Sequence, residues 1–294
     1  MGFSVGGVSD KLSVGLPTVI PMRNLRLGFT LIALSVLTLV AGRLQPTSWF
    51  EDIPYANSTF GNVVAGLLFY LATYFLGLQS LAYFRLPRFS FKSLIALFIA
   101  SIFIVGEISS SDNVRMSTQE TVMGIIFLLS IGYSEEIFSR AFVFGSLYRF
   151  GRKKAIFFSS LGFGLMHLNR YWASDWDPWL AYWHVMDTFG FGIFICALMI
   201  LTRSIWVGVI FHALIDWSIV FDKYVPPNPK DNEWEPSLWE GLTSPLFNFA
   251  IFVGLAAILL AIDRGSAPKW VKRVALKWKL IEPEFAMASV ALKS

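Results

Sequence analysis

Residues 119–148 read QETVMGIIFLLSIGYSEEIFSRAFVFGSLY, an apolar stretch long enough to cross about 30 Å of hydrocarbon as a helix. Two adjacent acids, Glu135 and Glu136, and one basic residue, Arg140, interrupt it. An ionisable side chain inside a membrane segment costs about 2.5–3.5 kcal/mol and commonly marks a working site. The stretch therefore predicts both a membrane helix and a functional position on it.

The composition of the whole chain indicates a membrane protein. Of its 294 residues, 55% are hydrophobic and 15% are charged, and the mean hydropathy is +0.59. These values exclude an ordinary soluble domain. The net charge of +4 comes mostly from short basic clusters between apolar stretches, a pattern typical of orientation in a bilayer and not of nucleic-acid binding.

Apolar windows divide the chain into a predicted all-α fold, a polytopic membrane helix bundle with about eight transmembrane helices over residues 26–264. The motif core spans residues 120–220. Residues 1–25 are expected to form a disordered cytoplasmic lead, and residues 265–294 a basic amphipathic tail on the cytoplasmic leaflet. The windows lie near residues 26–42, 60–84, 91–109, 119–148, 155–170, 183–202, 204–221 and 244–262.

The basic residues predict the orientation of this bundle. Most of the 24 Lys and Arg residues fall in the lead, in every second loop and in the tail. The positive-inside rule then places both termini in the cytoplasm. We expect a multi-pass integral protein of a prokaryotic cell membrane.

The two acids of the opening stretch are expected to have different roles. On a helix, Glu136 and Arg140 are spaced i, i+4 and share a face, so they can form an ion pair. Glu135 points about 100° away and is left free to act as a general base. The alternative is that all three residues line a polar seam between packed helices.

Two further motifs carry the same i, i+4 spacing. Phe163 and His167 share one helix face, as do His212 and Asp216. Counted at 1.5 Å per residue from the neighbouring basic loops, the acids, both histidines and the aspartate stand at similar heights. Three helices are therefore predicted to bring these side chains to one layer. The third histidine, His184, is expected to have a structural role at the interface.

This set of residues is suited to peptide hydrolysis by an activated water. A carboxylate and an imidazole can bind and deprotonate a water, and a second imidazole can stabilise the oxyanion that forms.

The sequence motifs of other intramembrane proteases are absent from this chain. The chain has no His-Glu-x-x-His sequence, no Gly-x-Gly-Asp sequence and no glycine after the Gly-Tyr-Ser134-Glu sequence. The single cysteine, Cys196, lies in an apolar run and is not expected to be a nucleophile.

In these three motifs the chain resembles the intramembrane glutamic endopeptidases of the CPBP family (CAAX protease and bacteriocin-processing, or Abi, proteins), which include the type II CAAX prenyl endopeptidases. The family pattern is Glu-Glu-x-x-x-Arg, Phe-x-x-x-His and His-x-x-x-Asn or Asp on three membrane helices. The resemblance covers roughly residues 120–220 and implies an eight-helix fold. It also implies that Glu135 and His167 activate water, that His212 and Asp216 form the oxyanion site, and that Glu136, Arg140 and Phe163 support them.

One position departs from the prenyl-processing members, which carry Asn where this chain has Asp216. An ionised aspartate cannot donate a hydrogen bond to an oxyanion. Asp216 must therefore be protonated, orient His212, or mark a different substrate.

The leading hypothesis is an endopeptidase that cuts a membrane-associated peptide or a lipidated protein in the bilayer, with no cofactor or metal and no nucleic-acid partner. One alternative is a metal-dependent membrane protease that uses the same carboxylates and histidines as ligands. The other is a non-catalytic membrane scaffold, immunity factor or proton-coupled carrier.

Overall fold

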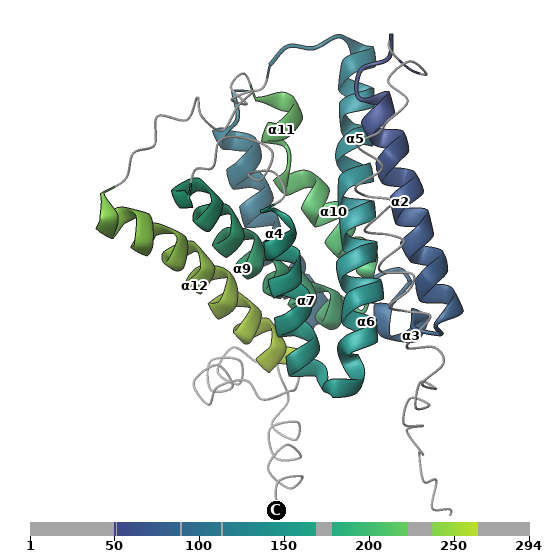
Figure 1. Ribbon diagram of the computed structural model, residues 1–294, viewed down its shortest axis with the longest axis vertical. Helices are drawn as coiled ribbons and strands as arrows, with labels where there is room; N and C mark the ends of the chain where they lie inside the picture. Colours follow the sequence, from purple (N-terminus) through teal and green to yellow (C-terminus); the bar gives the residue numbers. More distant parts are fainter. Residues whose placement is uncertain are drawn as a thin grey trace, which may run out of the picture.

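The computed structural model describes residues 50–168, 178–222 and 237–263, apart from residues 51, 89 and 113, and these residues form helices and connecting turns without a β-strand. This confirms the predicted all-α fold. The window near residues 26–42, the lead and the tail lie outside the described residues. The larger helices are α2 (Ala56–Phe75), α4 (Phe91–Ser110), α5 (Thr118–Glu136), α7 (Arg152–Met166), α9 (Pro178–Thr202), α10 (Ile205–Ile215) and α12 (Leu238–Asp263) (Figure 1).

Shorter helical pieces join or extend these helices. The fourth predicted window is one helical rod in which α5 continues into the π-helix η1 (Ile137–Val143), α6 (Phe144–Leu147) and the 3₁₀ turn η2 (Tyr148–Phe150). The α3 helix (Gln79–Ala82) follows α2, and α11 (Ser218–Phe221) follows α10. The rod spans 33 residues, which is about 50 Å and longer than the hydrocarbon core.

The predicted number of eight spans is not confirmed. Five described helices are long and apolar enough to cross a membrane, and they are residues 56–75, 91–110, 118–150, 178–202 and 238–263. Residues 205–221 form a shorter apolar segment, and α7 has only 15 residues. The predicted windows near residues 155–170 and 204–221 are therefore short helices in the structure.

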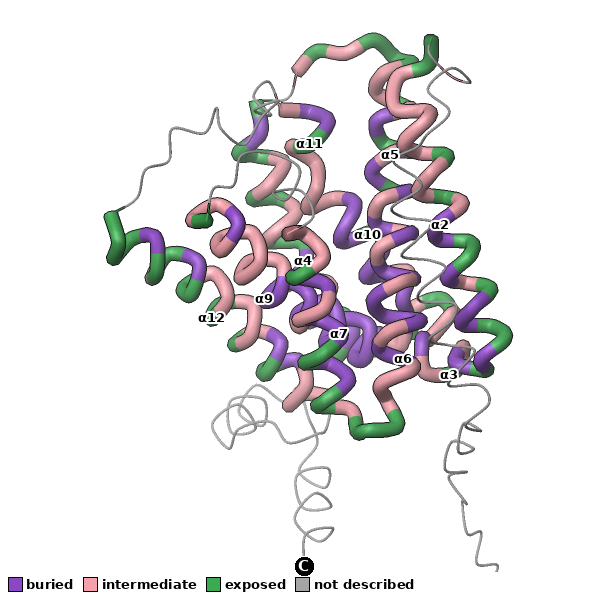
Figure 2. Tube along the Cα trace, viewed as in Figure 1, coloured by how far each residue is buried: buried purple, intermediate pink, exposed green. Residues whose placement is uncertain are grey.

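Helix α9 is the centre of the bundle. In its apolar window 72% of the residues are buried, against 17% in the windows of α4 and α12. Residues 189–202 form an unbroken apolar sequence except for Gly190, Gly192 and Thr202, so this half of the helix is buried on all sides. Figure 2 shows the buried positions concentrated where α5, α7, α9 and α10 meet, while exposed positions recur along α2 and α12.

Two close helix crossings bring the motif-bearing helices together. A Cβ atom at Gly132 of α5 would lie 2.5 Å from the carbonyl oxygen of Val209 on α10. A Cβ atom at Gly164 of α7 would lie 2.8 Å from the carbonyl oxygen of Val185 on α9. Small residues permit such contact between the backbones of membrane helices. Each crossing lies within one turn of a predicted site residue, Glu135 or His167.

The basic connections gather at one end of the bundle around Asp263, the last residue of α12. Its Oδ2 atom lies 2.9 Å from Arg152 Nη1 at the start of α7, and its Oδ1 atom lies 3.0 Å from Arg203 Nη2 between α9 and α10. The Lys92 ammonium of α4 donates to the Asp263 carbonyl at 3.4 Å. The Asp263 carboxylate, 9% exposed, therefore joins α12 to α7 and to the connection between α9 and α10, and its backbone carbonyl adds a contact with α4.

Replacing Asp263 by Ala should destabilise the bundle by about 1–3 kcal/mol, because it leaves two partly buried guanidinium groups without their carboxylate. Thermal unfolding of the purified protein in detergent would measure the loss. Asp112→Ala removes an exposed carboxylate with no ion pair in the described part of the chain, and it should leave the midpoint unchanged. Equal midpoints for both variants would refute a structural role for the Asp263 junction.

Candidate functional site

The site begins where α5 ends and the π-helix η1 starts. Glu135 and Glu136 are the last two residues of α5, and Arg140 lies within η1. The π-helix is shown by the Phe144 N–H, which donates to the carbonyl of Ser139 five residues earlier. Single π-helical turns inside an α-helix are rare and frequently occur at functional sites.

Glu136 is fully buried and holds two partners. Its Oε2 atom lies 3.1 Å from Arg140 Nε, which confirms the predicted ion pair. Its Oε1 atom accepts a hydrogen bond from His212 Nδ1 of α10 at 2.8 Å. Because an ionised carboxylate only accepts hydrogen bonds, the His212 Nδ1 atom carries a proton. Glu136 thus sets both the position and the tautomer of His212.

The Arg140 guanidinium is also fully buried, in an aromatic environment. It lies 4.4 Å from the centre of the Phe163 ring, within the range of a cation–π contact. Its two Nη atoms have no hydrogen-bond partner among the described residues. The same Phe163 ring packs edge to face against His167 at 4.9 Å and His212 at 5.8 Å. Phe163 is therefore the common packing partner of the basic groups of all three motifs.

His167 stands at the C-terminal end of α7 with its ring orientation fixed. Its Nδ1 atom lies 2.9 Å from the Phe163 carbonyl oxygen, which can only accept, so Nδ1 carries the proton. The unprotonated Nε2 atom of the neutral ring then faces Glu135 Oε2 at 4.0 Å. This separation is too long for a direct hydrogen bond.

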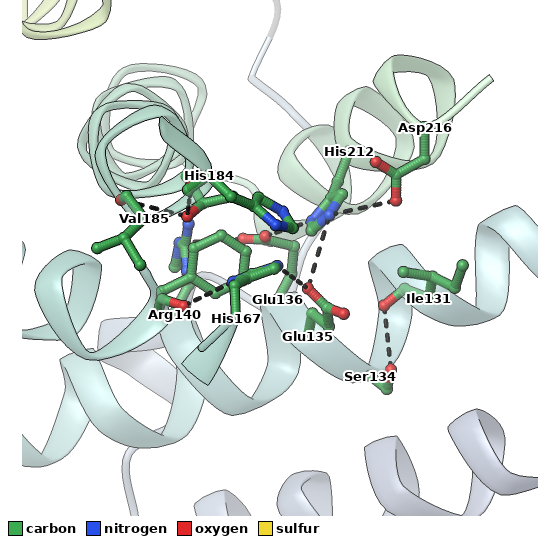
Figure 3. A network of polar contacts seen from close by, with 12 residues as sticks. Ile131, Ser134, Glu135, Glu136, Arg140, His167, His184, Val185, His212 and Asp216 are labelled. Atoms are coloured by element: carbon green, nitrogen blue, oxygen red, sulfur yellow. Dashed lines mark hydrogen bonds and ion pairs between the residues drawn. The ribbon is translucent and has the colours of Figure 1, made fainter. Parts of the chain in front are cut away.

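Glu135 faces the two histidines His167 and His212, as Figure 3 shows. Its Oε2 atom lies 3.7 Å from His212 Nε2, and it is buried without a hydrogen bond among the described residues. The side chain as a whole is 30% exposed. The His212 Nε2 atom also lies 3.5 Å from Asp216 Oδ2, at the C-terminal end of α10. Glu135 therefore combines one buried, unbonded oxygen with partial access from outside.

Two of the site helices end at the site itself. Helix α7 has 15 residues and α10 has 11, so they are about 22 Å and about 16 Å long. Both lengths are less than the hydrocarbon thickness of about 30 Å. Non-helical backbone at membrane depth is tolerated only where protein buries it or where it lines a water-filled cavity. The helix ends at His167 and Asp216 are thus positions where the backbone must be covered by protein or reached by water.

The structure brings together every side chain that the sequence singled out: Glu135, Glu136, Arg140, Phe163, His167, His212 and Asp216. Two contacts were not predicted. The hydrogen bond from His212 to Glu136 joins different helices, so helical spacing within one motif gave no sign of it. The ring of His184 lies 4.7 Å from that of His167, so the third histidine adjoins the site as well.

Other nucleophile and metal chemistries find little support in the described residues. The Ser134 hydroxyl donates to the Ile131 carbonyl of its own helix at 3.0 Å, and Cys196 is fully buried beside Ser159 and Ser160. No group of three or more His, Cys, Asp or Glu side chains in the described ranges is arranged to hold a metal ion. The geometry therefore gives the metal-dependent alternative no support.

A comparison with known protein families gives a match over the region that contains the three motifs. Residues 117–218 match the family described as type II CAAX prenyl endopeptidase Rce1-like, which confirms the resemblance seen in the sequence. No curated protein and no solved structure matches the chain. The family match supports a membrane protease of the CAAX type, and together with the five long apolar helices it fits an integral membrane peptidase.

The buried pair of Glu136 and Arg140 should show strong coupling in a double-mutant cycle. Each single change, Glu136→Gln or Arg140→Met, leaves one buried charge without its partner and should destabilise the protein by about 3–5 kcal/mol. The double variant removes both charges and should lose clearly less than the sum. Chemical unfolding in mixed micelles would measure all four proteins, and strictly additive losses would contradict the pairing.

Proposed function

We propose that the protein is an intramembrane endopeptidase that hydrolyses a peptide bond of a membrane-associated or lipid-modified substrate through a water activated by Glu135 and His167. The observation that carries this proposal is the position of Glu135 Oε2. It is buried, it has no hydrogen bond among the described residues, and it lies 4.0 Å from His167 Nε2 and 3.7 Å from His212 Nε2.

In the proposed reaction a water molecule bridges Glu135 and His167. Both groups accept hydrogen bonds, and a water has two O–H groups to donate, one to each acceptor at about 2.8 Å. Its lone pair is then directed away from both acceptors and toward an incoming carbonyl carbon. Attack forms the new C–O bond while the proton of the water passes to the Glu135 carboxylate.

His212 is placed to stabilise the oxyanion. Its Nδ1–H donates to Glu136, and its Nε2 atom faces Asp216 Oδ2 at 3.5 Å. Carboxylates on both sides favour the imidazolium form, in which Nε2–H can donate to the negatively charged oxygen. When the tetrahedral intermediate collapses, the C–N bond breaks and Glu135 returns its proton to the leaving amine.

Asp216 then acts through His212 and does not itself have to donate a hydrogen bond to the oxyanion. Of the three roles left open by the sequence, the 3.5 Å separation supports orientation of His212. The description of the matching family, type II CAAX prenyl endopeptidase, suggests a prenylated protein with a CAAX sequence as the substrate class.

Replacing Glu135 by Gln should lower kcat by at least about 100-fold, because the amide cannot accept the proton of the water. The assay is cleavage of a quenched fluorescent peptide with a prenylated CAAX sequence by purified protein in liposomes. Glu120→Gln is the matched control, since it makes the same change in the same helix and the amide can still complete the capping box at Ser117. Full activity of the Glu135→Gln protein would exclude the proposed mechanism.

Replacing Asp216 should separate the contributions of its shape and its charge. Asp216→Asn keeps a side chain that can orient His212 and should retain activity within about tenfold of the original. Asp216→Ala removes the contact and should lower kcat by about 100-fold, the size of effect seen when oxyanion stabilisation is lost. The same peptide assay measures both variants. An Asp216→Ala protein with normal kcat would show that this contact has no part in the reaction.

A further inference from the structure

Helix α4 reaches the site with one side chain that none of the three motifs includes. Glu107 is the single acidic residue of α4, whose apolar sequence is long enough to cross the membrane. Helix α4 packs against α10, which carries His212 and ends at Asp216. A carboxylate inside a membrane segment is costly and is normally paired with another group, so the partner of Glu107 indicates what this residue does.

The partner of Glu107 is the backbone of the turn that follows Asp216. The Glu107 Oε1 atom accepts a hydrogen bond at 3.3 Å from the N–H of Ser218, the first residue of α11. The turn is itself hydrogen-bonded, because the Asp216 N–H donates to the His212 carbonyl at 3.1 Å and the Ile219 N–H donates to the Asp216 carbonyl at 3.0 Å. Glu107 therefore ties the backbone on the C-terminal side of Asp216 to α4.

The backbone of Glu107 is held in place at the end of α4. Its carbonyl accepts hydrogen bonds from the Ser111 N–H at 3.2 Å, from the Ser111 hydroxyl at 2.9 Å and from the Ser110 hydroxyl at 3.0 Å. These bonds satisfy a carbonyl in the last turn of the helix, where carbonyl groups otherwise lack a partner. A side chain that starts from such a fixed element holds its partner more precisely than one that starts from a loop.

The charge of Glu107 also acts on Asp216. The two carboxylates are close enough for their negative charges to repel each other, whereas the imidazolium form of His212 attracts Asp216. Repulsion from one side and attraction from the other favour the observed arrangement, in which Asp216 Oδ2 lies 3.5 Å from His212 Nε2. The backbone contact and the charge of Glu107 therefore act in the same direction.

We propose that Glu107 is a positioning residue of the site, which holds the turn after α10 so that Asp216 stays against His212. This inference rests on the proposed peptidase function and adds to it a residue from outside the three motifs. The effect of Glu107 on the reaction passes through the Ser218 backbone and Asp216. It should therefore change the rate of the chemical step and not the binding of the substrate.

The test compares two replacements of Glu107 in the full-length protein in liposomes, with the prenylated CAAX peptide as substrate. Glu107→Gln keeps an oxygen that can accept from the Ser218 N–H, and it should keep kcat within about threefold. Glu107→Met keeps the length of the side chain but loses the acceptor, and it should lower kcat about tenfold while KM stays within about twofold. Asp112→Ala is the control, since it removes an exposed carboxylate just beyond the same end of α4, and it should change neither value.

A second measurement does not depend on cleavage. Hydrogen–deuterium exchange of residues 216–222, followed by mass spectrometry, reports how firmly the turn and α11 are held. The Glu107→Met protein should exchange about tenfold faster in this segment than the unmodified protein, because it loses one hydrogen bond to a charged acceptor. The Glu107→Gln protein should exchange at the unmodified rate.

The outcomes separate the inference from the function on which it rests. If none of the proteins cleaves the peptide, the peptidase proposal fails, and the exchange rates alone decide the positioning role. If the peptide is cleaved but Glu107→Met has a normal kcat, changes KM alone, or loses no more kcat than Glu107→Gln, the positioning role is excluded while the peptidase function stands. Equal exchange rates in all three proteins exclude the positioning role as well.

Discussion

The sharing of one buried carboxylate, that of Glu136, between Arg140 and His212 is the interaction on which the site depends. A fully buried charge is tolerated only with partners, and here the partners come from the same helical rod and from α10. Their positions fix α5 relative to α10 and fix the direction of the His212 ring. Glu135, as the preceding residue on the helix, must then point elsewhere, and it points between the two imidazoles. The structural carboxylate of Glu136 and the carboxylate that we propose to be reactive, that of Glu135, are thus adjacent in the chain.

Close packing of the four inner helices supports this arrangement. Lipid provides no hydrophobic force between membrane helices, so they associate through close contact and through polar groups. Gly132 and Gly164 permit the crossings of α5 with α10 and of α7 with α9, and the Phe163 ring fills the space between the motifs. The polar groups of the site are therefore held by backbones that cannot easily separate. Such support is what a site needs to keep its distances within a fraction of an ångström.

Sequence reasoning recovered what depends on spacing along a single helix. The pairs Glu136 with Arg140 and His212 with Asp216 were predicted because residues four apart share a face, and the common depth of the motifs followed from counting residues. Contacts between different helices could not be predicted from residue spacing along one helix. The approach of His184 to His167 depends on the crossing of α7 and α9 at Gly164. The π-helix is likewise not predicted by any residue pattern in the sequence. The family match over residues 117–218 covers the three motifs but reaches none of the helices before α5.

The endings of α7 and α10 at the site also have an electrostatic consequence. The aligned peptide dipoles of a helix place about half a negative charge at its C-terminus, and the effect is felt within the last turn. His167 stands at the C-terminal end of α7, and His212 lies in the last turn of α10. Both imidazoles therefore sit in the negative potential of a helix end. The two helix ends thus bring the negative ends of two backbone dipoles to one site.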